Sequence, residues 1–262
     1  MQILIGSDFH MEHRSSLSSV ISEYHYYTLP DVIVLAGDID THTNIEKTLS
    51  AFCELFEGSL VIYTPGNHEY YSSRDNKMAD IDAKLKALED KIPNLRVGLN
   101  EVIVHNNVGF YVGTMWSDID CKEEYQMVPA QEVDLIHPGD GERFGPHTCQ
   151  RLFADYKKGL MDFLHSTEYE KKVVVSHFSP SLEFDNPTVV SHGMDTFMKY
   201  YFCANLTEVI EDEKLAPDVW IYGHTHYSMD KTLSSGCRVI SCQLGYPKWD
   251  NTNWGKMEII HI

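Results

Sequence analysis

Five short apolar runs, each followed at once by a polar turn, constrain the fold of this chain more than any other feature. The runs lie at residues 3–5, 31–36, 60–63, 173–175 and 219–222. Strands that are buried on both faces have this near-continuous Val, Ile and Leu character. Between the runs, residues 15–27, 44–56, 75–90 and 149–166 carry apolar side chains at the three- and four-residue spacing of covering helices.

A second set of strand-like stretches has no helices within it. It comprises residues 101–105, 108–113, 231–233, 238–242 and 257–262. Stretches of this kind indicate a meander or a second sheet. We therefore expect a mixed α/β sandwich.

Length and segment pattern favour one domain. The chain has 262 residues, enough for one large domain or two small ones. It contains no internal repeat, low-complexity tract or linker that would divide it. We expect a single domain over residues 1–262, with irregular insertions near 117–147 and 179–193. Long irregular loops in compact domains are usually functional or mobile.

Charge and cysteine usage limit the partners and the compartment. The formal net charge of −18 repels phosphate backbones and anionic lipid surfaces, so neither nucleic acid nor membrane is an expected partner. Part of this excess of carboxylates could bind cations, and the 14 histidines are consistent with that. The six cysteines contain no C-x-x-C pair, so we expect reduced thiols. No signal peptide or membrane span is recognisable, and we expect a cytoplasmic protein.

Residues that bind metals follow each of the five apolar runs. The five turns read Ser7-Asp8-Phe9-His10, Gly37-Asp38-Ile39-Asp40, Pro65-Gly66-Asn67-His68-Glu69, Ser176-His177 and Gly223-His224-Thr225-His226. Ligands in open α/β sheets bind beyond the carboxyl ends of the strands. Each motif alone occurs by chance, but five repeats in register with five strands favour a shared site.

The types of donor indicate which metals would bind. Imidazole and carboxylate together suit a borderline transition metal, whereas Ca²⁺ or Mg²⁺ takes mostly oxygen ligands. In an extended backbone, residues i and i+2 point to one side, so the two donors of a pair such as Asp8 and His10, or His224 and His226, can reach a common ion. Seven donors exceed the need of one ion and fit two ions that share a bridging carboxylate. We expect Mn²⁺ or Fe first, with Zn²⁺, Ni²⁺ or Co²⁺ as alternatives.

The set and order of these motifs resemble the five motifs of calcineurin-like metallophosphoesterases, in particular the bacterial and phage-type branch. The resemblance spans residues 8–226. It implies a four-layer α/β/β/α sandwich of two mixed β-sheets flanked by helices. It also implies a two-metal centre that hydrolyses phosphoric esters, with a hydroxide that bridges the metals as the nucleophile.

The same resemblance assigns roles to individual residues. It implies that Asp8, His10 and His226 bind one metal, that Asn67, His177 and His224 bind the other, and that Asp38 bridges the two. It makes His68 the general acid that protonates the leaving group.

The second motif departs from the protein-phosphatase branch of the family. That branch has G-D-x-x-D-R-G, whereas this chain has Gly37-Asp38-Ile39-Asp40-Thr41-His42-Thr43, without the arginine that clamps phosphate. Asp40 is the expected partner that orients His68, although it stands one residue early. The missing clamp argues against a protein phosphatase and suits diesters, or phosphate binding by the metals alone. Arg14 and Arg74 are candidates to replace the clamp, and His192 is a third candidate for contact with substrate.

Three functions are compatible with these observations. The first is a dinuclear phosphoesterase acting on a small-molecule phosphate mono- or diester. The second is a nuclease or a cyclic-nucleotide phosphodiesterase of the same superfamily, and the charge of −18 argues against a processive nuclease. The third is a non-catalytic scaffold, which the complete ligand set argues against. The natural substrate and the oligomeric state stay open.

Overall fold

Two mixed sheets form the centre of the molecule. The computed structural model describes residues 1–21, 29–72, 76–119, 128–185, 199–247 and 258–262. The first sheet has the order β11-β1-β2-β3-β4, with β1, β2, β3 and β4 parallel and β11 antiparallel to β1. Its strands are β1 (Gln2–Gly6), β2 (Val32–Ala36), β3 (Leu60–Thr64), β4 (Leu95–Val97) and β11 (Glu258–His261).

The second sheet has the order β5-β6-β7-β8-β10-β9. Its inner strands β6, β7, β8 and β10 are parallel, whereas β5 and β9 pair antiparallel at the two edges. Its strands are β5 (Glu101–His105), β6 (Val108–Gly113), β7 (Lys171–Ser176), β8 (Val219–Ile221), β9 (Met229–Thr232) and β10 (Arg238–Ser241).

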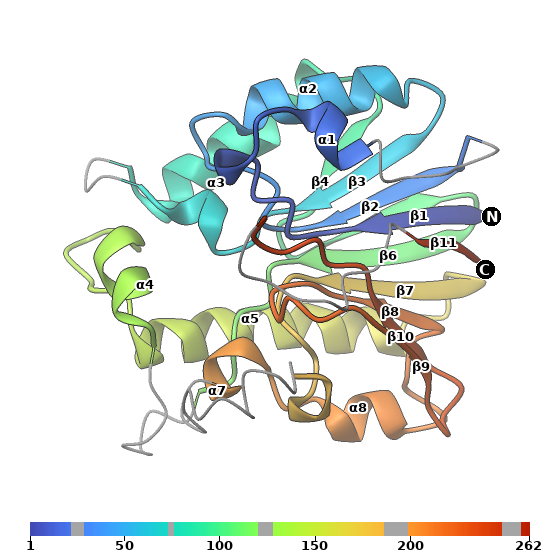
Figure 1. Cartoon of the computed structure of the whole chain (residues 1–262). Helices are drawn as coiled ribbons and strands as arrows, with labels where there is room; N and C mark the ends of the chain where they lie inside the picture. The colour runs from blue at the N-terminus through green and yellow to red at the C-terminus, as the bar shows by residue number, and fades with distance from the viewer. Residues whose placement is uncertain (22–28, 73–75, 120–127, 186–198, 248–257) are drawn as a thin grey trace.

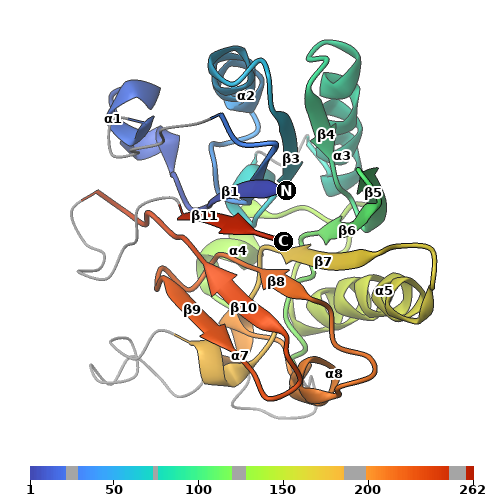
Figure 2. The same cartoon turned by 90° about the vertical axis from the view of Figure 1, so that its right-hand side faces the viewer.

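Helices cover the outer face of each sheet, which gives four layers (Figures 1 and 2). The α-helices are α1 (Leu17–Ile21), α2 (Ile45–Leu55), α3 (Met78–Lys86), α4 (Ala130–Leu135), α5 (Pro146–His165), α7 (Lys199–Phe202) and α8 (Thr207–Glu211). Short 3-10 helices are η1 (Met11–His13), η2 (His68–Tyr70), η3 (Ala87–Asp90) and η4 (Leu182–Phe184). In Figure 1, α1, α2 and α3 lie above the first sheet, and α5 and α8 lie below the second. The expected four-layer α/β/β/α sandwich is confirmed.

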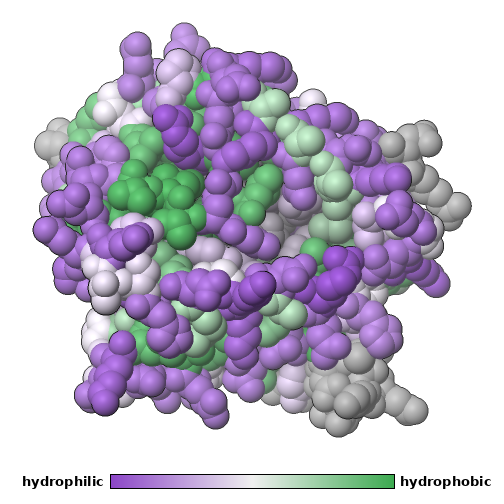
Figure 3. All heavy atoms as spheres, turned by 180° about the vertical axis from the view of Figure 1, so that it is seen from behind, coloured by the Kyte–Doolittle hydropathy of each residue, from purple (hydrophilic) through white to green (hydrophobic). Residues whose placement is uncertain are grey.

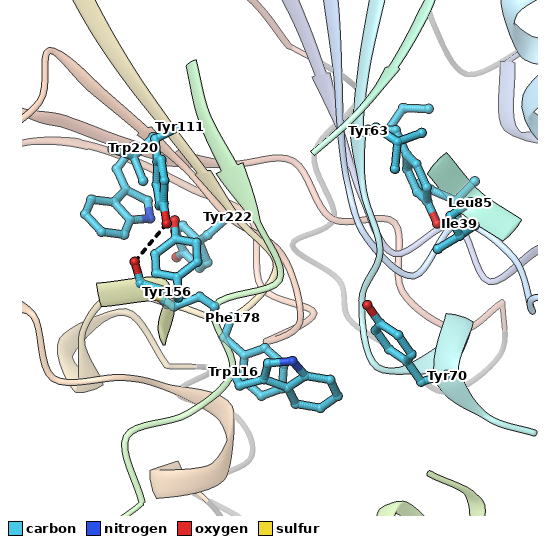
Figure 4. Close-up of a cluster of buried hydrophobic side chains, with 14 of the residues drawn as sticks. Ile39, Tyr63, Tyr70, Leu85, Tyr111, Trp116, Tyr156, Phe178, Trp220 and Tyr222 are labelled. Carbon is cyan, nitrogen blue, oxygen red and sulfur yellow. Dashed lines mark hydrogen bonds between the residues drawn. The ribbon is translucent and has the colours of Figure 1, made fainter. Parts of the chain in front are cut away.

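Alternation along the strands divides the core into two parts. Ile3 and Ile5 of β1, with residues of the second sheet such as Val173 and Val175, form an aliphatic cluster between the sheets. Leu4, on the opposite face of β1, belongs to the larger cluster beneath the helices. That cluster is rich in aromatic residues, and Figure 4 shows Tyr111, Tyr156, Trp220 and Tyr222 in one group and Tyr63, Tyr70, Leu85 and Ile39 in another.

Most strands lie where the sequence pattern predicts them, whereas some short elements were not predicted. The stretches 101–105 and 108–113 are β5 and β6, and 231–233 and 238–242 fall on β9 and β10, so two hairpins flank the second sheet. The stretch 257–262 contains β11, which joins the first sheet instead. Neither β4 nor α4 was expected, because three or six residues are too few to show a period. The expected helix at 15–27 is described only as α1, since residues 22–28 lie outside the described part.

The chain ends, the surface and the cysteines are described next to the fold. The two termini are adjacent, and the amino group of Met1 donates to the carbonyl of Ile262 at 3.0 Å. Hydrophilic side chains dominate the face shown in Figure 3. Within the described residues, no helix is both long enough and apolar enough to span a bilayer. The described cysteines are buried free thiols, as expected, and Cys121 lies outside the described part.

The packing of α2 on the first sheet gives a test of the fold. Leu49 is fully buried in the cluster beneath the helices, so Leu49→Ala removes packed atoms and leaves a cavity. We expect the free energy of unfolding to fall by about 2–5 kcal/mol, measured by urea denaturation. Leu55 on the same helix is 49% exposed, and Leu55→Ala should change it by less than about 0.5 kcal/mol. Equal losses in the two variants would contradict this packing.

Candidate metal centre

The seven expected ligands come together where the carboxyl ends of strands from both sheets meet. Asp8 and His10 follow β1, Asp38 follows β2 and Asn67 follows β3, all in the first sheet. His177 follows β7, while His224 and His226 follow β8, in the second sheet. The candidate ligands therefore come from both sheets.

The first group of donors consists of Asp8, His10, Asp38 and His226, whose ligand atoms all lie within 4.8 Å of one another. The Nε2 atoms of His10 and His226 are 3.0 Å apart. Nε2 of His226 lies 3.4 Å from Oδ1 of Asp8, and Nε2 of His10 lies 3.8 Å from Oδ2 of Asp38. We call this group the first site.

The second group consists of Asp38, His177 and His224, again within 4.8 Å of one another. Oδ1 of Asn67 lies 3.0 Å from Nε2 of His177, which adds the amide to the group. Nε2 of His177 is also 3.4 Å from Oδ2 of Asp38. We call these four residues the second site. Asp38 belongs to both sites, as a bridging ligand must.

The hydrogen bonds around the second site leave acceptors facing one another. Nδ1 of His177 bonds to the carbonyl of Ala36 at 2.8 Å and so carries its proton there, leaving Nε2 directed at two oxygen acceptors. Burial opposes a charge on His177, but Asp38 and Asp8 raise its pKa to about 9. The carboxylates around His177 therefore favour positive charge at this site, and a bound cation would supply it.

Two of the other histidines, His224 and His10, are suited to donate a lone pair. Nε2 of His224 is buried without a hydrogen-bond partner, and burial together with His177 keeps the pKa of His224 well below its usual value. Burial also lowers the pKa of His10 to about 4. Neutral imidazoles are the form that binds metals. The donors at these two sites therefore fit a pair of metal ions.

The backbone around the ligands differs from the extended form that the sequence analysis expected. Asp8, His10, Asp38, His224 and His226 have φ between 45° and 70°, in the left-handed region. Asp and His are among the few residue types that adopt this region with any frequency. Left-handed residues turn the chain sharply at the strand end, and this turn, rather than alternation along a strand, brings Asp8 and His10 to the same ion.

Two glycines allow the close approach of the motif loops. At Gly37, where φ is +87°, a side chain would collide with the ring of His177. At Gly66, it would collide with the carboxylate of Asp38. Glu69 holds the same loops together, since its buried carboxylate accepts from the backbone N–H groups of Gly66, Asp38 and Ile39 at 2.7, 3.1 and 2.8 Å.

His68 has a different carboxylate partner from the one expected. Its Nδ1 lies 2.9 Å from Oε1 of Glu12, and its Nε2 lies 2.9 Å from the hydroxyl of Tyr246. Burial opposes protonation of His68, but Asp38 and Glu12 raise its pKa. Asp40 instead accepts from the backbone N–H of Thr41 and from the hydroxyl of Thr48. The expected pairing of Asp40 with His68 is therefore wrong, because both carboxylate oxygens of Asp40 accept hydrogen bonds from Thr41 and Thr48 instead.

The candidates for substrate contact are only partly described. Arg14 lies near the centre, but its Nε donates to the carbonyl of Phe9 and one Nη to the carbonyl of Gly245, each at 2.6 Å. These bonds tie the loop after β1 to the loop after β10. Arg74 and His192 lie outside the described residues.

Sequence reasoning assigned no role in the centre to three side chains that lie there. Glu12 follows a ligand by two residues but belongs to no motif. Glu132, on α4, is buried and accepts from Nδ2 of Asn67 at 3.0 Å and from the hydroxyl of Tyr71. Tyr246 comes from the far end of the chain. Glu132 had one signal, since a glutamate among the apolar positions of a helix is unusual, but that helix itself was not recognised.

The fold and these donors define a metal-dependent hydrolase of phosphate esters. Residues 1–228 match the family model of calcineurin-like phosphoesterases, and the chain belongs to this family. The resemblance on which the sequence analysis relied is thus confirmed.

Two individual proteins illustrate the relationship. The uncharacterized protein L509 of Acanthamoeba polyphaga mimivirus is 24% identical over 256 residues, which cover 92% of this chain and 89% of that protein. The solved structure of phosphopantetheinyl hydrolase (PptH) from Mycobacterium tuberculosis is 18% identical, covers 98% of this chain and 95% of its own, and has a TM-score of 0.69. This structural likeness shows the shared fold.

The contact between Glu132 and Asn67 predicts a specific loss of metal binding. Glu132 holds the amide nitrogen of Asn67, so that Oδ1 faces the second site. We expect Glu132→Ala to weaken binding at the second site about 10- to 100-fold, as measured by calorimetric titration with Mn²⁺, and to leave the first site unchanged. The matched control is Asp134→Ala on the same helix, whose side chain is 74% exposed. If the two variants bind Mn²⁺ equally well, Glu132 does not orient Asn67.

Proposed function

We propose that this chain hydrolyses phosphate mono- or diesters of small molecules with two divalent metal ions, Mn²⁺ or Fe being the first expectation. Asp8, His10, Asp38 and His226 would hold one ion, and Asp38, Asn67, His177 and His224 the other. The observation that carries the proposal is the position of Asp38, within ligand distance of donors from both groups. Bound ions of this kind supply Lewis-acid activation of the phosphate and of the attacking water.

The chain itself supplies the proton for the leaving group. His68 is buried beside Asp38, and its Nε2 points away from Glu12 toward the hydroxyl of Tyr246. An imidazolium held in this way can donate from Nε2 to the oxygen that leaves phosphorus. The backbone N–H of His68 donates to Oδ1 of Asp38 at 2.9 Å, so the acid and the shared ligand keep a fixed relation.

The substrate preference follows from the side chains around the ligands. A phosphomonoester carries an extra negative charge, which related enzymes of the protein-phosphatase branch meet with an arginine that this chain lacks. The guanidinium of Arg14 is engaged with two backbone carbonyls, which argues against its service as that clamp. A diester places less charge in the centre and suits this arrangement better.

A comparison of two synthetic esters tests both the activity and the preference. With Mn²⁺ added, we expect faster hydrolysis of bis-p-nitrophenyl phosphate than of p-nitrophenyl phosphate, loss of both activities to a chelator, and recovery with Mn²⁺. Asp38→Asn should abolish both reactions because it neutralises the ligand shared by the two sites. Preference for the monoester would overturn the diester assignment. Rates no higher than those of Asp38→Asn would overturn the proposed function.

The role of His68 predicts a dependence on the leaving group. His68→Ala should slow esters of poor leaving groups, such as phenyl esters, by about 10²-fold or more, and should affect p-nitrophenyl esters much less. A p-nitrophenolate leaves readily without a proton. His165→Ala, an exposed histidine at the end of α5, is the matched control. A uniform loss for both types of ester would show that His68 does not act as the general acid.

A further inference from the structure

One carboxylate oxygen contacts both a metal ligand and the candidate general acid. Oε1 of Glu12 lies 2.9 Å from Nδ1 of His68 and 3.2 Å from Nδ1 of His10. Glu12 stands in the 3-10 helix η1, which begins directly after His10, and its side chain is only 15% exposed. The rings of His10 and His68 meet edge to face with centroids 4.4 Å apart, so one acid can reach both.

These two contacts fix which ring nitrogen is available in each histidine. An ionised carboxylate only accepts hydrogen bonds, so Nδ1 carries the proton in both rings. The lone pair of His10 is then on Nε2, which faces Asp38 and His226 in the first site. In His68, the same constraint leaves Nε2 facing the hydroxyl of Tyr246.

Other acids near the centre are committed elsewhere. Both carboxylate oxygens of Asp40 accept from the loop and from Thr48. Glu69 is bound to the backbone N–H groups of the motif loops. Among the described residues, Glu12 is thus the carboxylate that contacts Nδ1 of both histidines.

We propose that Glu12 is a positioning residue that orients His10 for the first metal and His68 for proton donation through the same oxygen. This inference rests on the proposed function, because it concerns a residue that orients side chains of the proposed centre. It makes metal affinity at the first site and leaving-group protonation depend on one side chain. Carboxylates that hold the far nitrogen of a metal-binding imidazole commonly strengthen metal binding 10- to 100-fold.

The first experiment measures metal binding alone. In a His224→Ala background, which disables the second site, Glu12→Ala should weaken binding of Mn²⁺ at the first site about 10- to 100-fold by calorimetric titration. Glu12→Gln, which keeps the shape and loses the charge, should fall between that variant and the parent. The control is Glu89→Ala. Glu89 is another partly buried carboxylate, and it contacts Lys86 and the backbone N–H of Val97 rather than any candidate ligand. Thermal unfolding without metal checks that each variant folds.

The second experiment measures the leaving-group dependence at saturating Mn²⁺. Glu12→Ala should slow the hydrolysis of a phenyl ester at least about 10-fold more than that of the p-nitrophenyl ester. The double variant Glu12→Ala/His68→Ala should have the same ratio of phenyl to p-nitrophenyl ester rates as the single variant His68→Ala. In both variants the general acid that Glu12 positions is absent. A residue with a purely structural role would slow both esters equally.

The outcomes separate this inference from the proposed function. If the native chain hydrolyses the esters but Glu12→Ala matches Glu89→Ala in metal affinity and in the rate ratio, Glu12 has no positioning role and the proposed function stands. If the native chain hydrolyses neither ester, the proposed function and the role of Glu12 toward His68 both fail. The titration still decides the role of Glu12 toward His10, since it needs no turnover.

Discussion

The buried carboxylate of Asp38 is the charge on which the rest of the centre depends. Its side chain is almost fully buried, at 2% exposure, and the Nε2 atoms of His177, His10 and His68 lie 3.4, 3.8 and 4.0 Å from Oδ2. Burial alone would favour the neutral acid, but these imidazoles, His177 foremost, hold the pKa of Asp38 well below its usual value. An ionised carboxylate in such a place is stable only when cations or donors surround it.

The two sheets provide those surroundings from opposite sides. Asp38 follows β2 in the first sheet and His177 follows β7 in the second, and the aliphatic layer between the sheets sets the distance between them. Gly37 and Gly66 permit the approach, and Glu69 bonds to the backbone of both loops. The geometry of the centre therefore depends on the packing of the two sheets, since a shift of one sheet would move half of the candidate ligands away from the other half.

The sequence predicts the parts of the centre that have a local signature. The strands and the donors after them are recognisable because each motif immediately follows a β-branched run, as in Gly223-His224-Thr225-His226 after β8. Glu12, Glu132 and Tyr246 have no such signature, because they reach the centre through tertiary contacts that span from 56 to 178 residues. Asp40 was the expected partner of His68 because of its place in a motif, yet spacing along the chain does not determine which carboxylate reaches a ring. The left-handed turns were missed because extended geometry is the default assumption at the end of a strand.

The left-handed turns place candidate metal ligands at backbone positions that glycine would adopt more easily. At Asp8, His10, Asp38, His224 and His226, glycine would suit the backbone best, but glycine has no side chain to bind a metal. Each such conformation in a residue with a side chain costs on the order of 1 kcal/mol. Selection for thermal stability without metal ions would therefore favour the loss of the ligands one by one. Under the proposed function, the side chains at these positions serve the centre at a cost to the stability of the fold.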